Sequence, residues 1–370
     1  MKNAHCTKVI EGKNLSGPRF ARRQWRPPRP HARPAETVYT AGMSNQFGWG
    51  VIGTGGIAAL QVSDLLTAGL RVSAVGSRRE ESARAFGERF GIPKAHGSYE
   101  ALVAEPEVDI VYVATPHPMH VTAALLAIEA GKHVLLEKPF TMNASEARRV
   151  AEAAKAKGVF LMEAMWTRFL PTMTRVMELI RGGAIGPARV LLSDHNQYIP
   201  REKAVRLHEP ELGGGALLDL GIYPISLASY LFGAPASVTA RATFTELGVD
   251  ELTAMIFEYE TGAQASLHTG FLALGPNVAS IVGTEGRIDI DSVWYTQTSF
   301  TLRDGAGEIV ERYEEAVEGR GMQYQAQEVE RCLREGLTTS PTMPVEESVA
   351  IMETMDEVRR QIGLTYPGLE

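Results

Sequence analysis

From residue 47 onward, short apolar runs of about the length of one strand alternate with longer stretches whose apolar residues recur at helical spacing. The short runs are rich in Val and Ile, as buried parallel strands usually are. We expect strands at 48–53, 70–77, 109–114, 133–137 and 159–162, with helices at 57–66, 80–90, 119–130 and 145–157. Strands that are joined by helices in this way predict an α/β domain with a doubly wound parallel sheet.

After Pro171 the pattern changes from alternating strands and helices to a series of short strands that follow one amphipathic helix. Turn sequences such as 260–262 and 283–286 separate these strands, which favours a mostly antiparallel sheet that is open on one face. The expected strands are 188–198, 236–245, 252–259, 263–271, 278–283 and 287–290, and two helices follow at 322–335 and 345–361. The chain therefore divides into a tail (1–46), an α/β domain (47–165) and an α+β domain (166–370).

The first 46 residues differ in character from the rest of the chain. Residues 19–34 are rich in Arg and Pro and have no apolar periodicity, so we expect them to be disordered. Arg22 and Arg23 are reminiscent of a twin-arginine export signal, but no apolar region follows them. Translation that starts at Met43 would also account for this tail, and we prefer that interpretation.

The charge of the protein is unevenly distributed. The net charge is -7, but residues 1–46 contain nine Lys and Arg against two Asp and Glu, and the remainder contains 28 against 42. An acidic body without a basic stripe argues against nucleic acid as a partner. No apolar run reaches about 18 residues, so we expect no membrane span. The two cysteines have no metal-binding spacing, so we expect no metal site and a cytoplasmic location.

A glycine-rich loop follows the first expected strand and opens the first expected helix. Residues 53–58 read G-T-G-G-I-A, which fits the pattern G-x-G-x-x-A. In this context the glycines allow a tight turn and a close approach of a pyrophosphate to the helix N-terminus. An ordinary glycine-rich turn is the alternative. The candidate contacts of a dinucleotide are Gly53, Thr54, Gly55, Gly56 and Ile57.

The end of the second expected strand bears on the choice of dinucleotide. An NAD enzyme usually carries Asp or Glu there, which accepts from the ribose 2'-hydroxyl. This chain has Ser77 and Arg78 instead, and Arg can bind a 2'-phosphate through its charge and its forked donors. Arg78 could also be only a solvated surface residue. We expect NADP to be preferred over NAD.

Several further motifs resemble those of the Gfo/Idh/MocA oxidoreductase family, whose hallmark is Glu-Lys-Pro after the fifth strand of the Rossmann domain. The resemblance covers nearly everything from residue 47 onward. It rests on 137–139, on 114–117 with His120, on 163–169, and on 213–215 leading to Asp219 and Tyr223. The last two segments are most similar to the branch with dimeric dihydrodiol dehydrogenases, NADP-dependent D-xylose dehydrogenases and glucose-fructose oxidoreductase.

The resemblance implies that Lys138, Asp219 and Tyr223 are catalytic. Asp219 and Tyr223 are four residues apart, so on one helix they share a face. Many family members have His where this chain has Tyr223, which favours the branch that uses tyrosine. Positive charge near Tyr223 should lower its pKa toward that of a usable base. A half-buried core tyrosine and a surface lysine are the structural alternatives.

The same resemblance assigns further residues to the cofactor cleft. His117 and His120 lack further ligands at metal spacing, and we interpret them as lining the cleft. Trp166 and Arg168 follow the last strand of the first domain, where family position implies contact with the nicotinamide end. The other candidates are Thr115, Pro116, Glu137 and Lys138.

The resemblance implies an NAD(P)-dependent oxidoreductase that transfers a hydride between NADP(H) and a hydroxyl or carbonyl carbon. The expected substrate is a sugar, such as an aldopyranose, or a trans-dihydrodiol, in a pocket built by loops such as 200–212. Two alternatives remain: an NAD-dependent glycosidase of the same superfamily and a cofactor-binding protein without turnover. The open face of the second sheet predicts a homodimer.

Overall fold

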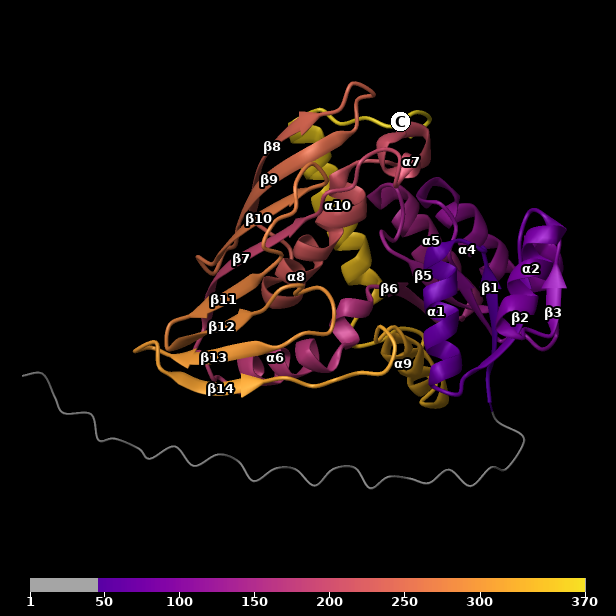
Figure 1. The fold of residues 1–370 in the computed structure, drawn as a ribbon, viewed down its shortest axis with the longest axis horizontal. Coiled ribbons are helices and arrows are strands. Elements are labelled where there is room, and N and C mark those ends of the chain that lie inside the picture. Colours follow the sequence, from indigo (N-terminus) through magenta and orange to yellow (C-terminus); the bar gives the residue numbers. More distant parts are fainter. Residues whose placement is uncertain (1–45, 370) are drawn as a thin grey trace, which may run out of the picture. The chain divides into compact units, whose positions relative to one another are not determined.

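A six-stranded parallel sheet forms the first part of the fold (Figure 1). The computed structural model describes residues 46–369. The expected disorder at residues 19–34 and the alternative start at Met43 lie outside the described residues. The strand order is β3-β2-β1-β4-β5-β6. The strands are β1 (Gly48–Ile52), β2 (Arg71–Gly76), β3 (Lys94–His96), β4 (Ile110–Val113), β5 (His133–Glu137) and β6 (Leu161–Ala164).

Helices connect these strands and cover the sheet. They are α1 (Gly56–Thr67), α2 (Glu80–Phe90), α3 (Tyr99–Val103), α4 (His120–Glu129) and α5 (Ala144–Lys157). The strand order reverses beside β1, which has β2 on one side and β4 on the other. Ligands of doubly wound sheets bind outside the carboxyl ends of the strands at such a reversal. The topology therefore places the binding site at the ends of β1 and β4.

An eight-stranded sheet forms the second part of the fold, in the order β14-β13-β12-β11-β7-β10-β9-β8. Only β7 and β10 pair in parallel, and all other neighbours are antiparallel. The strands are β7 (Ala188–Asn196), β8 (Ser237–Phe244), β9 (Asp250–Glu258), β10 (Gln264–Gly270), β11 (Ala279–Gly283), β12 (Gly286–Ile290), β13 (Phe300–Asp304) and β14 (Ile309–Tyr313). The predicted fold class is confirmed.

One face of this second sheet carries the core, and the other face is open. Along β9 and β10 the buried residues alternate with exposed ones, so that Met255 and Leu267 are buried while Ile256 is 49% exposed. Helices α8 (Ile222–Phe232) and α10 (Val345–Ile362) pack on the buried face. Helix α6 (Pro171–Arg181) lies at the end with β13 and β14, where Arg175 pairs with Glu311.

The structure contains three strands that the sequence pattern did not reveal. β3 has only three residues, none of them buried, so it carries no apolar run that the pattern could detect. β13 and β14 form a hairpin at the edge of the second sheet, and β14 has no buried residue. β3 and β14 are edge strands, which bury little side-chain surface and give a weak apolar signal, whereas β13 lies next to the edge and buries three of its five residues.

The chain returns to the first domain after it has completed the second sheet. Helix α9 (Gln323–Arg334) packs against α1. The buried carboxylate of Asp64 accepts hydrogen bonds from the main-chain N–H groups of Arg320 (3.1 Å) and Met322 (2.8 Å). Gln325 donates to Gln61 in the same interface. Helix α9 therefore packs against the first domain although it follows the second sheet in the sequence.

One helical stretch among the described residues has the length and apolar character of a membrane span. It runs through Pro210–Phe232 with a mean hydropathy of 1.3, and 72% of its tested window is buried inside the fold. A core helix of a soluble protein has the same properties. The burial explains the apolar composition, because this stretch contains α8, which packs against both the second sheet and α10.

Candidate active site

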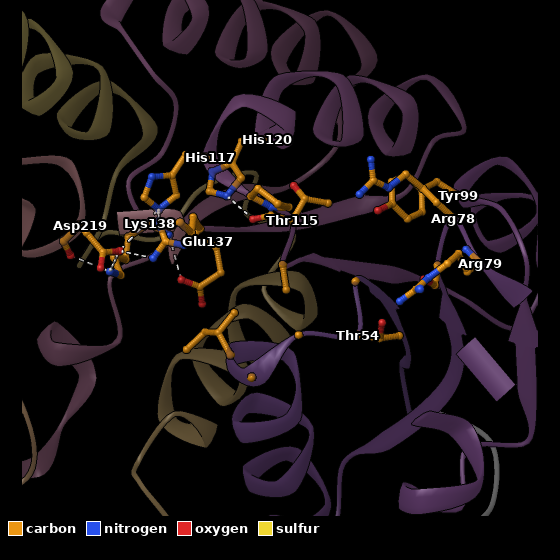
Figure 2. Close-up of a pocket in the computed structure, with 18 of the residues that line it drawn as sticks. Thr54, Arg78, Arg79, Tyr99, Thr115, His117, His120, Glu137, Lys138 and Asp219 are labelled. Carbon is orange, nitrogen blue, oxygen red and sulfur yellow. Dashed lines mark hydrogen bonds and ion pairs between the residues drawn. The ribbon is translucent and has the colours of Figure 1, made fainter. Parts of the chain in front are cut away.

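A cavity of about 770 Å³ lies along the carboxyl ends of the strands of the first sheet. The residues that follow β1, β2, β4 and β5 all line it, and Asp219 and Tyr223 close it from the second domain. Figure 2 shows its length, with Arg78, Arg79 and Tyr99 at one end and Lys138 and Asp219 at the other. The cavity thus connects the loop predicted to bind a dinucleotide with the residues predicted to be catalytic.

The glycine-rich loop has the geometry that a bound pyrophosphate requires. Gly53 has φ +111°, and a Cβ atom on it would lie 2.5 Å from the carbonyl oxygen of Ala114. Gly55 and Gly56 face open space within the cavity lining. Among residues 46–369 no side chain caps the N-terminus of α1, so its first N–H groups are available to an anion. These features fit a dinucleotide at the positions expected from the sequence.

The far end of the cavity carries the two arginines after β2. Ser77 is buried, and its hydroxyl accepts from the main-chain N–H of Arg79 at 3.4 Å. Arg78 lies beside Tyr99, where burial raises the pKa of the phenol and the charge of Arg78 acts against it. Arg79 and Tyr99 were not among the expected cofactor contacts. Arg79 could have been included as the neighbour of Arg78, whereas no sequence signal pointed to Tyr99.

The loop after β4 supplies Thr115, Pro116, His117 and His120 to the cavity wall. Both ring nitrogens of His120 face main-chain oxygens, of Pro139 at 2.9 Å and of Thr115 at 3.0 Å. Burial lowers the pKa of His120 to about 4, against these hydrogen bonds. His120 therefore joins the loop after β4 to the loop after β5, and its ring is held by the protein itself.

Glu137 is buried at the end of β5 beneath the catalytic end of the cavity. One carboxylate oxygen accepts from the Tyr112 hydroxyl at 2.5 Å, and the other accepts from the main-chain N–H of Lys138 at 3.1 Å. Burial raises the pKa of Glu137 to about 7, and these donors oppose that rise. Glu137 thereby fixes the start of the segment that carries Lys138.

Lys138 reaches across the cavity to the second domain. Its Nζ donates to the main-chain oxygen of Asp219 at 2.8 Å and lies 3.5 Å from Oδ1 of Asp219. The same nitrogen lies 4.9 Å from the centre of the Tyr223 ring. Burial lowers the pKa of Lys138, but the surrounding anionic groups outweigh burial and raise it, so the ammonium is retained. The three residues predicted to be catalytic are brought together.

The segment that carries Asp219 and Tyr223 is not a regular α-helix. Leu217–Gly221 forms a π-helical turn, and α8 begins immediately after it. The buried carboxylate of Asp250 anchors this turn by accepting from the main-chain N–H of Leu217 at 2.8 Å. π-helical turns often occur at functional sites. Here the turn carries Asp219 and the first turn of α8 carries Tyr223, and both residues line the cavity, as their spacing had predicted for one α-helix.

Burial dominates the protonation of Tyr223. Its hydroxyl accepts from Nε1 of Trp166 at 3.1 Å, and its ring packs edge-on against His195. Burial raises the pKa of Tyr223, while the charge of Lys138 and the Trp166 donor lower it, and burial is the largest effect. Lys138 acts on this pKa in the predicted direction but does not by itself outweigh burial, and the prediction also counted the positive charge of an oxidised nicotinamide.

Trp166 and Arg168 do not line the cofactor cavity. Trp166 reaches the site only through its hydrogen bond to Tyr223, and its ring borders a second cavity together with Arg320. The buried guanidinium of Arg168 donates to Ser226, to the main-chain oxygen of Thr342 and to Glu347. The expected cofactor contact of Arg168 is thus corrected, because its donors are used to join α8 and α10.

Arg206 is a residue of the cavity that the sequence interpretation missed. It belongs to α7 (Val205–His208) and pairs with Oδ1 of Asp219 at 2.9 Å. The only available signal was its position in the segment 200–212, which was expected to build the pocket. Within residues 46–369 no group of three or more His, Cys, Asp or Glu has the arrangement of a metal site.

Comparison with known proteins identifies the family. Residues 47–165 match the model of an oxidoreductase family with an NAD-binding Rossmann fold, and residues 173–289 match the GFO/IDH/MocA C-terminal domain. The chain is 37% identical to trans-1,2-dihydrobenzene-1,2-diol dehydrogenase of Mus musculus and 38% identical to that of Xenopus laevis. These matches cover 86% of this chain and 98% and 99% of the relatives.

Solved structures with the same fold extend this comparison. An aldose-aldose oxidoreductase from Caulobacter crescentus superposes with a TM-score of 0.77 at 26% identity, over 86% of this chain and 97% of that one. A 3-ketoreductase from Actinomadura kijaniata in complex with NADP and TDP-benzene has a TM-score of 0.76 at 27% identity, over 86% and 98%. The chain therefore belongs to the Gfo/Idh/MocA family of NAD(P)-dependent oxidoreductases.

Proposed function

We propose that this enzyme transfers a hydride between NADP(H) and a hydroxyl-bearing carbon of a sugar or a cyclic trans-diol. The observation that carries the proposal is the meeting of Lys138, Asp219 and Tyr223 at one end of a cavity whose other end carries two arginines. The relatives that support this substrate class are a dihydrodiol dehydrogenase and an aldose-aldose oxidoreductase.

In this proposal each residue of the site has a separate role in proton transfer, charge stabilisation or positioning. The nicotinamide ring, when bound, supplies the hydride chemistry. The Tyr223 hydroxyl exchanges the proton of the substrate oxygen, and the Lys138 ammonium stabilises negative charge on both oxygens. Asp219 holds Lys138 in place chiefly through its main-chain oxygen, which accepts from Nζ at 2.8 Å. In the direction of alcohol oxidation, the rate should rise with pH through the pKa of Tyr223, because the base is the tyrosinate.

A panel of aldopyranoses and cyclic diols, assayed at 340 nm with NADP and with NAD, tests this function. We expect a steady absorbance change with at least one member of the panel. The NAD-dependent glycosidase alternative predicts that a glycoside assayed beside the panel is hydrolysed without a net absorbance change, and a non-catalytic binding protein predicts no product from any of these compounds. No turnover of any sugar or diol with either cofactor would refute the proposal.

We predict that Arg78→Ala weakens NADP binding about 10- to 100-fold and leaves NAD binding nearly unchanged. A charged hydrogen bond to a phosphate is worth roughly 1.5 to 3 kcal/mol, and about 1.4 kcal/mol corresponds to a factor of ten. Fluorescence titration with both cofactors measures the two dissociation constants. Arg84→Ala is the control, because Arg84 lies on α2 and pairs with Glu80 outside the cavity. Equal losses for NADP and NAD would show that Arg78 does not bind the 2'-phosphate.

We also propose a homodimer through the open face of the second sheet. Leu192 and Ile256 are 50% and 49% exposed on this face. A twofold dimer is the commonest arrangement of soluble oligomers, and a twofold interface on this face would bury these apolar residues. Light scattering at micromolar concentration should give the mass of a dimer, and Ile256→Glu should give a monomer. A monomeric wild-type protein would contradict this proposal.

A further inference from the structure

Arg206 joins three segments around the catalytic end of the cavity. Its side chain, on α7, is 36% exposed. Nη2 lies 2.9 Å from Oδ1 of Asp219, and Nη1 lies 3.3 Å from Nε2 of His117. His117 comes from the loop after β4, and Asp219 comes from the π-helical turn before α8. Arg206 is therefore the group that connects a histidine of the first domain with the proposed catalytic carboxylate of the second.

The hydrogen bonds of His117 determine which of its nitrogens carries the proton. Nδ1 lies 3.1 Å from the main-chain oxygen of Gly213, which can only accept, so Nδ1 must carry a proton. Nε2 then presents its lone pair to the Nη1 donor of Arg206. Burial lowers the pKa of His117 well below its usual value, and the charge of Arg206 lowers it further. His117 is thus a neutral ring that accepts from Arg206.

The carboxylate of Asp219 has three basic neighbours at different distances. Nη2 of Arg206 is the nearest at 2.9 Å, followed by Nζ of Lys138 at 3.5 Å and Nε2 of His117 at 3.7 Å. Lys138 makes its shorter bond to the main-chain oxygen of Asp219 instead. Arg206 therefore forms the closest ion pair with the Asp219 carboxylate, and the ammonium of Lys138 lies beside the Tyr223 ring.

We propose that Arg206 is a positioning residue: it binds the carboxylate of Asp219, so that His117 stays neutral and Lys138 acts on Tyr223 and on the substrate oxygen. The proposal rests on the proposed function for its catalytic consequence, but its effect on His117 is independent of turnover. The other titratable groups that face His117 are His120 and Lys138, and those that face Lys138 are Tyr223 and Glu137.

The first test follows the ring of His117 by NMR as a function of pH, in wild type and in Arg206→Ala. His117→Gln identifies the resonance. Without Arg206, Nε2 loses its donor and faces the carboxylate of Asp219, so the pKa of His117 should rise by about 1 to 3 units. Arg206→Lys keeps the charge and should restore most of the low value. Arg201→Ala, on the same segment but paired with Glu209, should leave it unchanged. An unchanged pKa of His117 in Arg206→Ala would overturn the proposal.

The second test is the pH profile of turnover in the same variants. In Arg206→Ala the freed carboxylate attracts Lys138 away from Tyr223, so the pKa of Tyr223 rises. A rise of about one unit moves the ascending limb to higher pH and lowers kcat at pH 7 about tenfold. Arg206→Lys should recover most of kcat, and thermal melting confirms that the variants are folded.

The outcomes of the two tests separate this proposal from the proposed function. An increase in KM alone, with an unchanged pH profile, would mean that Arg206 binds substrate directly and does not act through Asp219, which contradicts the proposal. If the wild type turned over no sugar or diol, the proposed function would fail. The titration of His117 would still decide whether Arg206 holds Asp219 as described.

Discussion

Replacement of Tyr223 by Phe should lower kcat by about 100- to 10,000-fold, the range that a general acid or base usually contributes. The ring would keep its edge-on contact with His195, and only the hydroxyl that accepts from Trp166 would be lost. NADP affinity should stay near the wild-type value, because the phenol lies at the catalytic end of the cavity. Steady-state kinetics combined with cofactor titration measures both quantities.

Tyr198→Phe is a matched control for this variant. Tyr198 is 62% exposed and makes no contribution to the cofactor cavity, so the same loss of a hydroxyl should leave kcat unchanged. If Tyr223→Phe kept most of its activity, the proton would have to pass through another group. Asp219 and His195 are the next candidates by position, because both lie within the same buried cluster.

Lys138→Met should be comparably severe, because it removes the ammonium while keeping a long apolar side chain. Burial raises the pKa of Tyr223, and Lys138 is the strongest group that lowers it. Its loss should therefore move the ascending limb of the pH profile to higher pH and reduce kcat. The measurement is kcat as a function of pH, with the exposed Lys157 on α5, as Lys157→Met, for control.

The double variant Lys138→Met, Tyr223→Phe distinguishes a functional pair from two independent residues. Residues that act as one unit lose their function together, so the double variant should be little worse than either single variant. Multiplicative losses would show that Lys138 and Tyr223 contribute separately. That result would contradict the role assigned to Lys138 as the electrostatic partner of Tyr223.

The parts of the fold that the sequence predicted are those in which local chemistry determines local structure. The run Trp49–Ile52 is completely buried, and the glycines after it are needed where Gly53 adopts φ +111° beside Ala114. The apolar run and the positive φ of Gly53 are local properties of the chain, so they are visible in the sequence, whereas the contact with Ala114 is not. The residue pattern points to the cavity residues that follow β1 and β2, and the family resemblance adds those that follow β4 and β5.

The parts that could not be predicted depend on contacts between residues far apart in the chain. Arg206 meets His117 across 89 positions, and no local pattern records that meeting. For Arg168 the sequence suggested a contact that the structure does not show. Its position after β6 suggested a cofactor contact, whereas its hydrogen-bond partners Ser226 and Glu347 lie much later in the sequence. Tyr99 reaches the cavity from the N-terminus of α3, which the sequence pattern did not reveal.

The most direct test of the central claim is to follow the hydrogen that is transferred. The substrate is D-glucose deuterated at carbon 1, or trans-1,2-dihydrobenzene-1,2-diol deuterated at its carbinol carbons, whichever turns over. Mass spectrometry of the reduced cofactor should find one deuterium per molecule of NADPH formed, in amounts equal to the oxidised product. Product that is oxidised at the deuterated carbon, without deuterium in the reduced cofactor, would contradict net hydride transfer to NADP.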